Sequence, residues 1–275
     1  MFRNLVFKLV YFLGDKGLGL PLSFLARLDA RKFTKQSKTK LKAMYSYKSR
    51  DNHMKSKSQY GQELFIYEQI FNKKHEGIFI EVGGNDPILL NNTYALEMLG
   101  WSGIAFEPMD YLREKWEEKR ATTCYPYAIG DKEGWIEFNE VIEQDASLMT
   151  KGTARGQGVL SSVAGYGRDL DKLGRSFSIN TVKKQMRPLE NVLCELNIQH
   201  VDVMFVDVEG FELNVLKGVN FSKVSIACIC VEAPILYKET CELRTVLVKN
   251  GYTLVAHIGG DDIFLRNEIA LLKNK

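Results

Sequence analysis

A short polar stretch that follows an apolar run is the first candidate for chemistry in this sequence. The stretch GGNDP, residues 83–87, comes directly after the apolar run GIFIEV at 77–82. In open α/β sheets, ligands bind beyond the carboxyl ends of the strands. Gly83 and Gly84 allow the backbone to approach a ligand closely or to adopt a positive φ. The composition is equally typical of a simple turn, so the stretch alone is weak evidence.

A glutamate at the end of a second apolar run strengthens the case. Glu107 and Pro108 close the run GIAFEP, residues 103–108. Glu107 follows Gly83 by roughly the ~20 residues at which an acid binds the ribose hydroxyls in dinucleotide folds. A solvated acid at a strand end is the simpler alternative. The loop and Glu107 together indicate a nucleoside site more strongly than either does alone.

The chemistry of the first loop argues against a nicotinamide cofactor. A pyrophosphate is typically bound by G-x-G-x-x-G at the start of a helix. Here the third glycine is absent, and Asp86 would place negative charge near the phosphates. An acid instead suits S-adenosylmethionine, which combines an adenosine with an amino acid end and a cationic sulfonium. We therefore expect S-adenosylmethionine as the cofactor.

Three further acids follow other apolar runs and could serve a methyl acceptor. Asp207 and Glu209 end VDVMFVDVEG at 201–210, and Glu232 ends SIACICVEAP at 225–234. Residues two apart on a strand face the same side, so Asp207 and Glu209 would share the ligand crevice. A carboxylate there can act as general base toward a hydroxyl. We assign Glu209 as the base and Asp207 to the cofactor. The alternatives are that Glu209 caps the next helix and that Glu232 is merely solvated.

The cysteines and histidines show no metal-binding pattern. The five cysteines form no C-x-x-C pair, and their odd number suits a reducing compartment. The four histidines are scattered, and no spacing resembles a zinc site. Asp207 and Glu209 lack an obvious third ligand, so we predict no metal.

The elements that would position these residues alternate along the chain, which predicts a parallel sheet with helices on both faces. The last segment has the pattern of an antiparallel hairpin at the edge of that sheet. Apolar runs predict strands at 77–82, 103–108, 124–131, 134–141, 201–210, 225–234 and 253–267. Helical spacing predicts helices at 61–71, 90–100, 111–120, 187–197, 212–218 and 242–252.

Residues 144–186 lack a clear periodic pattern, and we interpret them as a variable loop or lid. The stretch is rich in glycine, serine and charge. Loops on a rigid scaffold often carry specificity. Within it, Arg155 and Arg168 could meet an acidic sugar or a phosphate. A poorly ordered insertion with solvated charges is an equal alternative.

The N-terminal part differs in charge from the rest. Residues 26–57 carry eleven Lys or Arg and two Asp, although the whole chain has a formal net charge of only +3. Residues 1–13 have apolar positions at helical spacing but fall short of the ~20 needed to span a membrane. We expect a basic arm over residues 1–57 that docks on the body or a partner, or contacts a membrane peripherally. We expect no nucleic-acid binding and a cytoplasmic protein, either free or associated with a membrane.

Several stretches in the right order resemble one enzyme family. These are SQYGQELFI, FIEVGGNDPILLNNTYALEMLGWSGIAFEP, YAIGDKEG and VDVMFVDVEGFELNVLKGVNF. They are similar to the FkbM family of S-adenosylmethionine-dependent methyltransferases, over about residues 58–267. The resemblance implies a Rossmann-like class I methyltransferase fold over 58–275. It also implies O-methylation, often of sugars or secondary metabolites.

The resemblance assigns further cofactor contacts. It implies that a cradle for the amino acid end is formed by Glu81, Gly83, Asn85 and Asp86, closed by Asn92 and Thr93. It places the adenine beside Ala128, Ile129 and Asp131, and Asp207 and Glu209 facing the methyl group. The chain differs from the usual family pattern at Pro87, Asn91 and Phe205, where glycine, serine and lysine are common.

The sequence thus predicts a methyltransferase acting on a small-molecule or glycan hydroxyl. A non-catalytic binding or scaffold protein with the same fold is the main alternative. A nicotinamide-dependent oxidoreductase is a third, disfavoured by the first loop. The acceptor and the oligomeric state are not predicted.

Overall fold

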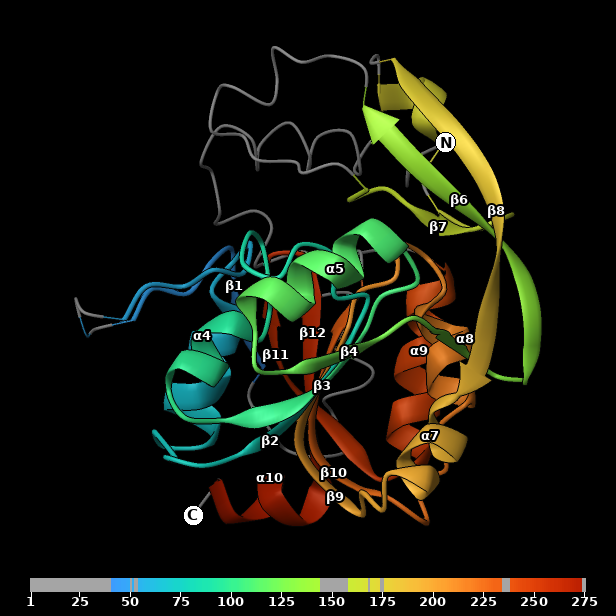
Figure 1. Cartoon of the computed structure of the whole chain (residues 1–275). Helices are drawn as coiled ribbons and strands as arrows, with labels where there is room; N and C mark the ends of the chain where they lie inside the picture. The colour runs from blue at the N-terminus through green and yellow to red at the C-terminus, as the bar shows by residue number, and fades with distance from the viewer. Residues whose placement is uncertain are drawn as a thin grey trace.

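The computed structural model describes residues 41–49, 51, 54–143, 158–167, 169–173, 176–233 and 238–273. These residues form an α/β structure with two sheets and flanking helices (Figure 1). The predicted N-terminal helix and most of the basic arm lie outside the described residues, as do Arg155 and Arg168. In the described part, no helix is long and apolar enough to cross a membrane.

The larger sheet has eight strands, and its central strands are parallel, as predicted from the alternating elements. β9 pairs in parallel with both β2 and β10, whereas β12 is antiparallel to both β10 and β11. The antiparallel hairpin at the edge is therefore confirmed. In spatial order the strands are β1 (Lys42–Met44), β11 (Tyr252–Ile258), β12 (Asp261–Arg266), β10 (Ser225–Glu232), β9 (His200–Val206), β2 (Ile78–Val82), β3 (Ser102–Phe106) and β4 (Thr123–Tyr125).

Strand β1 comes from the predicted basic arm. It pairs in parallel with β11, outside the hairpin, and Ala43 on it is buried. This short segment of the arm therefore belongs to the folded body. Three residues, the first of them a lysine, carry too little apolar pattern to be recognised as a strand.

The second sheet has four strands and differs from the prediction. β6 is antiparallel as expected, but it pairs with β7 and β8 rather than with the main sheet. Residues 177–186, interpreted as part of a loop, form most of β8, so that interpretation is wrong for them. β8 is polar and largely exposed on both faces, so it lacks the alternation that marks a strand. The order is β5 (Ala128–Gly130), β8 (Phe177–Pro188), β6 (Gly134–Glu143) and β7 (Ser162–Val163).

Helices cover both faces of the larger sheet (Figure 1). The largest apolar cluster joins one face to α7 (Leu189–Glu195), α8 (Glu212–Lys217) and α9 (Lys238–Lys249). The second cluster joins the other face to α3 (Gln62–Phe65), the π-helical turn η1 (Ile66–Ile70), α4 (Tyr94–Met98) and α10 (Asn267–Lys273). The helix α5 (Asp110–Lys119) packs near β3 and β4 through Trp116, which contacts Ala105 and Cys124. One short 3-10 helix, η2 (Leu170–Leu173), lies before β8.

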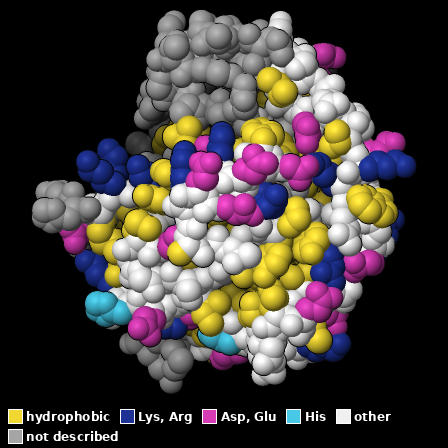
Figure 2. Space-filling view, in the orientation of Figure 1, with side chains coloured by type: hydrophobic (Ala, Val, Ile, Leu, Met, Phe, Trp, Pro, Cys, Tyr) yellow, Lys and Arg dark blue, Asp and Glu magenta, His cyan; other side chains and the backbone are white. Residues whose placement is uncertain are grey.

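The order of the strands defines where a ligand can bind. The chain passes outward from β2 to β3 and β4, and then starts again beside β2 with β9 and β10. In open α/β sheets a ligand binds at such a reversal, which here lies between β2 and β9, beyond the carboxyl ends of the strands. Figure 2 shows that side chains of both charges are mixed over the face seen in Figure 1.

Candidate active site

The loops after β2 and β9 lie against each other at the reversal of strand order. Gly83 has φ 85°, and a Cβ there would lie 1.9 Å from the carbonyl oxygen of Asp207. In return, the backbone N–H of Asp207 donates to the carbonyl of Val82 at 3.0 Å. Only glycine fits such a close approach. The predicted cofactor loop and the predicted catalytic loop are therefore adjacent.

Glu107 contacts the backbone of the first loop through its carboxylate. One carboxylate oxygen accepts from the backbone N–H of Asn85 at 2.8 Å, and the other accepts from Met109 at 2.9 Å. Trp116 donates from its indole to the Asn85 carbonyl at 2.8 Å, and Asn85 has φ 40°. The backbone N–H and the carbonyl of Asn85 are thus both held, the first by Glu107 and the second by Trp116.

The burial of Glu107 affects its charge. Only 3% of the residue is exposed, and Pro108 beside it is also buried. Burial raises the pKa of Glu107 to about 7, although the two backbone hydrogen bonds lower it. A carboxylate has about four lone-pair positions, and these bonds use two of them. Glu107 therefore keeps acceptor capacity for ribose hydroxyls.

Asp86 shapes the loop locally. Its Oδ1 accepts from the backbone N–H groups of Ile88 at 3.0 Å and Leu89 at 2.9 Å. Its Oδ2 lies 4.0 Å from the ammonium of Lys115. An Asp that bonds backbone N–H groups just ahead of it is typical of a turn. The turn interpretation of this stretch is therefore confirmed for Asp86, and its part in a ligand site stays a prediction.

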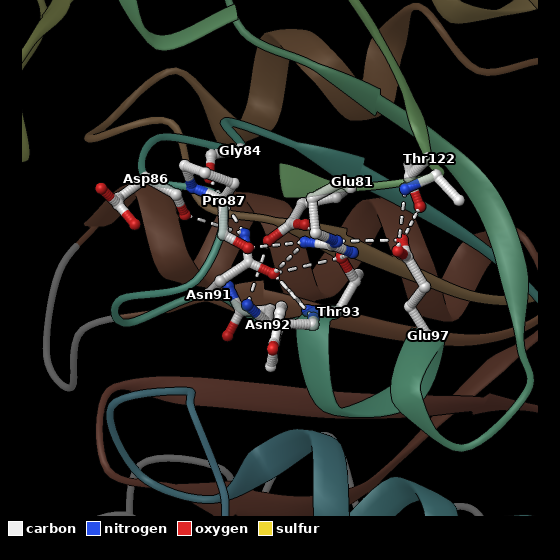
Figure 3. Close-up of polar contacts among 12 residues, drawn as sticks. Glu81, Gly84, Asp86, Pro87, Asn91, Asn92, Thr93, Glu97 and Thr122 are labelled. Carbon is white, nitrogen blue, oxygen red and sulfur yellow. Dashed lines mark hydrogen bonds and ion pairs between the residues drawn. The ribbon is translucent and has the colours of Figure 1, made fainter. Parts of the chain in front are cut away.

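Glu81 and the residues before α4 form a buried network (Figure 3). Glu81 accepts from the backbone N–H of Asn92 at 3.0 Å and from the hydroxyl of Thr93. Burial raises the pKa of Glu81 to about 7, whereas the charge of Arg120 lowers it. Asn91 accepts from the backbone N–H groups of Thr93 at 3.0 Å and Tyr94 at 2.8 Å. The side chain of Asn91 thus bonds the first backbone N–H groups of α4, whose N-cap is Thr93.

Arg120, just after α5, joins this network and was missed by the sequence analysis. Its guanidinium, fully buried, donates to Pro87 O at 2.8 Å and to the side chains of Asn91 and Thr93 at 3.1 Å each. It also pairs with Glu97 at 2.9 Å. In the sequence Arg120 ends a run of charged residues that reads as a solvated helix. The preceding Trp116, whose ring lies 4.4 Å from the guanidinium, was the one available sign of burial there.

Gln62 and Asp261 also belong to the site and were not predicted. The amide nitrogen of Gln62 donates to Asn92 at 3.0 Å and to Asp261 at 2.6 Å. Burial raises the pKa of Asp261 well above its ordinary value, and the charges of Asp207 and Glu232 add to this effect. Asp261 opposes Glu232 in the register of β12 and β10. The structure thus groups the predicted acids Asp207 and Glu232 around a buried acid of the terminal hairpin.

Glu209 lies in a turn rather than on a strand. β9 ends at Val206, and Glu209 has φ 53° with a half-buried side chain, while Asp207 is exposed. Because both residues lie beyond the end of the strand, strand alternation does not determine which way their side chains face. Glu209 also lies two residues before Phe211, which is the N-cap of α8. Glu212 instead accepts from the loop N–H groups of Val208 at 3.1 Å and Gly210 at 2.9 Å.

The residues expected beside the adenine lie on β5 and just after it. Ile129 is 2% exposed within the largest apolar cluster. Asp131 lines a surface hollow together with Asn191 of α7 and Lys217 of α8. Their contact with an adenine stays a prediction. Among the described residues, no group of three or more His, Cys, Asp or Glu is arranged to hold a metal ion.

The residues present fit S-adenosylmethionine. The backbone adopts positive φ at Gly83 and Asn85, which leaves peptide groups turned in directions that ordinary strands do not offer. Glu107 has unused acceptor positions. Acids on both loops suit a cationic ligand. A pyrophosphate would meet the carboxylate of Asp86 instead.

Fold and site together define a Rossmann-like, class I methyltransferase. The sequence matches the methyltransferase FkbM domain over residues 81–254, more than half of the chain. The chain therefore belongs to the FkbM methyltransferase family, whose members use S-adenosylmethionine. A search of curated proteins found no match.

Proposed function

We propose that the protein transfers the methyl group of S-adenosylmethionine to a hydroxyl of a sugar, a glycan or a secondary metabolite. The observation that carries this is the contact between Gly83 and the Asp207 carbonyl. It places the loop with Asp207 and Glu209 directly beside the cofactor loop. The neighbouring acids Glu232 and Asp261 make this side of the site suited to hydroxyl acceptors.

When bound, S-adenosylmethionine would supply an electrophilic methyl group from its cationic sulfonium and, as the sulfur–carbon bond breaks, leave as the neutral thioether S-adenosylhomocysteine. Glu107 holds the ribose, and the backbone from Gly83 to Asp86 holds the amino acid end. Glu209 accepts the proton that the acceptor hydroxyl loses as its oxygen forms the new bond to carbon. Asp207 orients the cofactor and offsets its charge. Positioning of the two reactants supplies a further part of the rate.

The test is transfer of a tritiated methyl group from S-adenosylmethionine to a panel of methyl glycosides and phenols. Glu209→Gln removes the base and should lower kcat by about 10²–10⁴-fold. Glu118→Gln, an exposed acid on α5, is the matched control and should keep full activity. Methylation of amines alone, or an unchanged kcat for Glu209→Gln, would contradict the proposal. Binding of S-adenosylhomocysteine without any turnover would favour the scaffold alternative.

We also propose a peripheral membrane contact through residues 1–57. The positive surplus of residues 26–57 supports attraction to anionic lipid. Sedimentation with phosphatidylserine vesicles should retain the full chain at low salt and release it at high salt. Equal sedimentation with neutral phosphatidylcholine vesicles would contradict an electrostatic contact.

A further inference from the structure

The second sheet carries a hollow beside the predicted catalytic loop. Its volume is about 220 Å³, and it is lined by residues of β6, β7 and β8 and of the chain between β6 and β8. Apolar walls come from Val141, Leu160, Leu170 and Ile179, and polar groups come from Asn139, Ser162 and Asp171. This is less than the ~300–1,000 Å³ of pockets for drug-sized ligands. The hollow therefore suits one ring rather than a long chain.

The turn after β7 fixes this hollow to the loop after β9. The rings of Tyr166 and Phe211 meet edge to face, with centroids 4.6 Å apart. A Cβ on Gly210 would lie 3.1 Å from the backbone nitrogen of Gly167, and one on Gly167 would lie 3.6 Å from the carbonyl oxygen of Glu209. The two backbones thus touch at glycines. The hollow and the catalytic loop are parts of one packed unit.

The loop after β9 contacts both the cofactor loop and the turn that borders the hollow. Gly83 of the cofactor loop contacts the Asp207 carbonyl. Gly167, in the turn after β7, contacts the backbone at Glu209 and Gly210. A methyltransferase must hold its acceptor next to the cofactor and within reach of a base. The hollow therefore adjoins the loop that carries the proposed base.

The groups in the hollow match the surface of a sugar ring. Tyr166 lines it, is 45% exposed and packs edge to face with Phe211, so it offers an aromatic ring at the hollow. The C–H face of a pyranose is apolar and flat enough to stack on such a ring. Asn139 accepts from Thr181 at 2.7 Å and still carries an amide donor group. Ser162 donates to the Tyr166 carbonyl at 3.2 Å and keeps acceptor positions.

We propose that this hollow binds the methyl acceptor and that the acceptor group is a single pyranose ring stacked on Tyr166. The inference rests on the proposed O-methyltransferase function and names its substrate class and its acceptor subsite. Ile179 on β8 would contact the ring from the apolar side of the hollow.

Binding can be tested without turnover. Saturation-transfer NMR would use the full chain loaded with S-adenosylhomocysteine and the methyl glycosides of glucose, galactose, mannose and rhamnose. At least one glycoside should receive saturation. Tyr166→Ala should weaken its binding about three- to tenfold, whereas Tyr166→Phe should keep it. Trp135→Ala removes an aromatic ring that is 72% exposed on β6 outside the hollow, and should change nothing.

The remaining measurements separate the possible failures. If Tyr166→Ala does not fold, Ile179→Lys serves instead, because Ile179 is 55% exposed and a lysine there would obstruct the hollow. Titration with S-adenosylhomocysteine should give the same affinity for all variants. If no glycoside receives saturation, or if Tyr166→Ala binds as well as the wild type, the acceptor subsite is overturned. Methyl transfer to another hydroxyl compound would then leave the O-methyltransferase function standing. Glycoside binding that Tyr166→Ala weakens, without methylation of any hydroxyl, would show a sugar site in the hollow but would overturn its role as the acceptor subsite together with the O-methyltransferase function.

Discussion

The amide of Gln62 donates to the carboxylate of Asp261 over 2.6 Å, although 199 residues separate the two in sequence. The same nitrogen donates to Asn92 at 3.0 Å. Gln62 therefore links the segment before α4, next to the cofactor loop, to the hairpin of β11 and β12. That hairpin lies beside the predicted acids Asp207 and Glu232. Both of its partners are buried.

Gln62→Leu should destabilise the protein by about 1–3 kcal/mol, because two buried acceptors lose their donor. Urea unfolding measures the change in the free energy of unfolding. Gln69→Leu is the matched control, since Gln69 lies exposed in the following π-helical turn and should change stability by less than about 0.5 kcal/mol. Equal effects of the two substitutions would show that the Gln62 bridge contributes nothing.

Arg120→Met should cost about 3–5 kcal/mol, because it leaves buried partners without their cation. It should also weaken binding of S-adenosylhomocysteine, since Arg120 holds the carbonyl of Pro87 in the cofactor loop. Calorimetric unfolding and ligand titration measure the two effects. The control is Arg113→Met, which breaks a half-exposed pair with Glu117 on the same helix. A stable variant with unchanged ligand affinity would argue against Arg120 as an anchor of the loop.

Stability should fall as the pH rises from 4.5 to 7. Burial raises the pKa of both Glu81 and Glu107 from 4.5 to about 7. In that range the folded protein holds protons that the unfolded chain has released, so folding becomes less favourable as the pH rises. Each group contributes a slope of up to about 1.4 kcal/mol per pH unit.

Glu107→Gln should therefore flatten the pH dependence, so that the variant gains stability relative to the wild type between pH 5 and pH 8. Urea unfolding at four pH values tests this, with Glu118→Gln as the exposed control. Parallel curves for the wild type and Glu107→Gln would show that Glu107 titrates normally in the folded state.

Asp262→Asn should strongly destabilise the terminal hairpin. Asp262 pairs with Arg244 at 2.6 Å and with His257 at 2.7 Å, and the side chains of Asp262 and Arg244 are fully buried. Loss of its charge would remove the buried carboxylate that pairs with the buried guanidinium of Arg244, at a cost of about 3–5 kcal/mol. Glu190→Gln breaks the exposed pair with Lys223 and should leave the thermal midpoint unchanged. Similar midpoints for both variants would refute a structural role of the buried pair.

The parallel sheet was predictable because its strands are continuous apolar runs bounded by polar loops. The same runs placed Glu107 and Glu232 at their carboxyl ends, where the structure has them. The second sheet was not predictable in this way. β8 is polar on both faces, and its pairing with β6 depends on contacts that no local pattern encodes.

The residues of the site that the sequence did not predict were missed for the same reason. Arg120 looks like the end of a solvated helix, and its burial depends on Asn91 and Thr93 from a distant loop. Gln62 and Asp261 meet only when the first helix of the body packs against the last hairpin. Strand alternation also placed Glu209 on a strand, whereas the strand ends three residues earlier.

The most direct test of the account is a calorimetric titration of the full chain with S-adenosylhomocysteine, alongside Glu107→Ala and the control Glu118→Ala. NAD is titrated in parallel. The account predicts micromolar binding by the wild type and by Glu118→Ala, no binding of NAD, and an affinity at least about tenfold lower for a folded Glu107→Ala, as expected when about 1.4 kcal/mol or more of ribose contact is lost. Undiminished binding by Glu107→Ala, or no binding of S-adenosylhomocysteine by the wild type, would contradict the site described at the ends of β2 and β3.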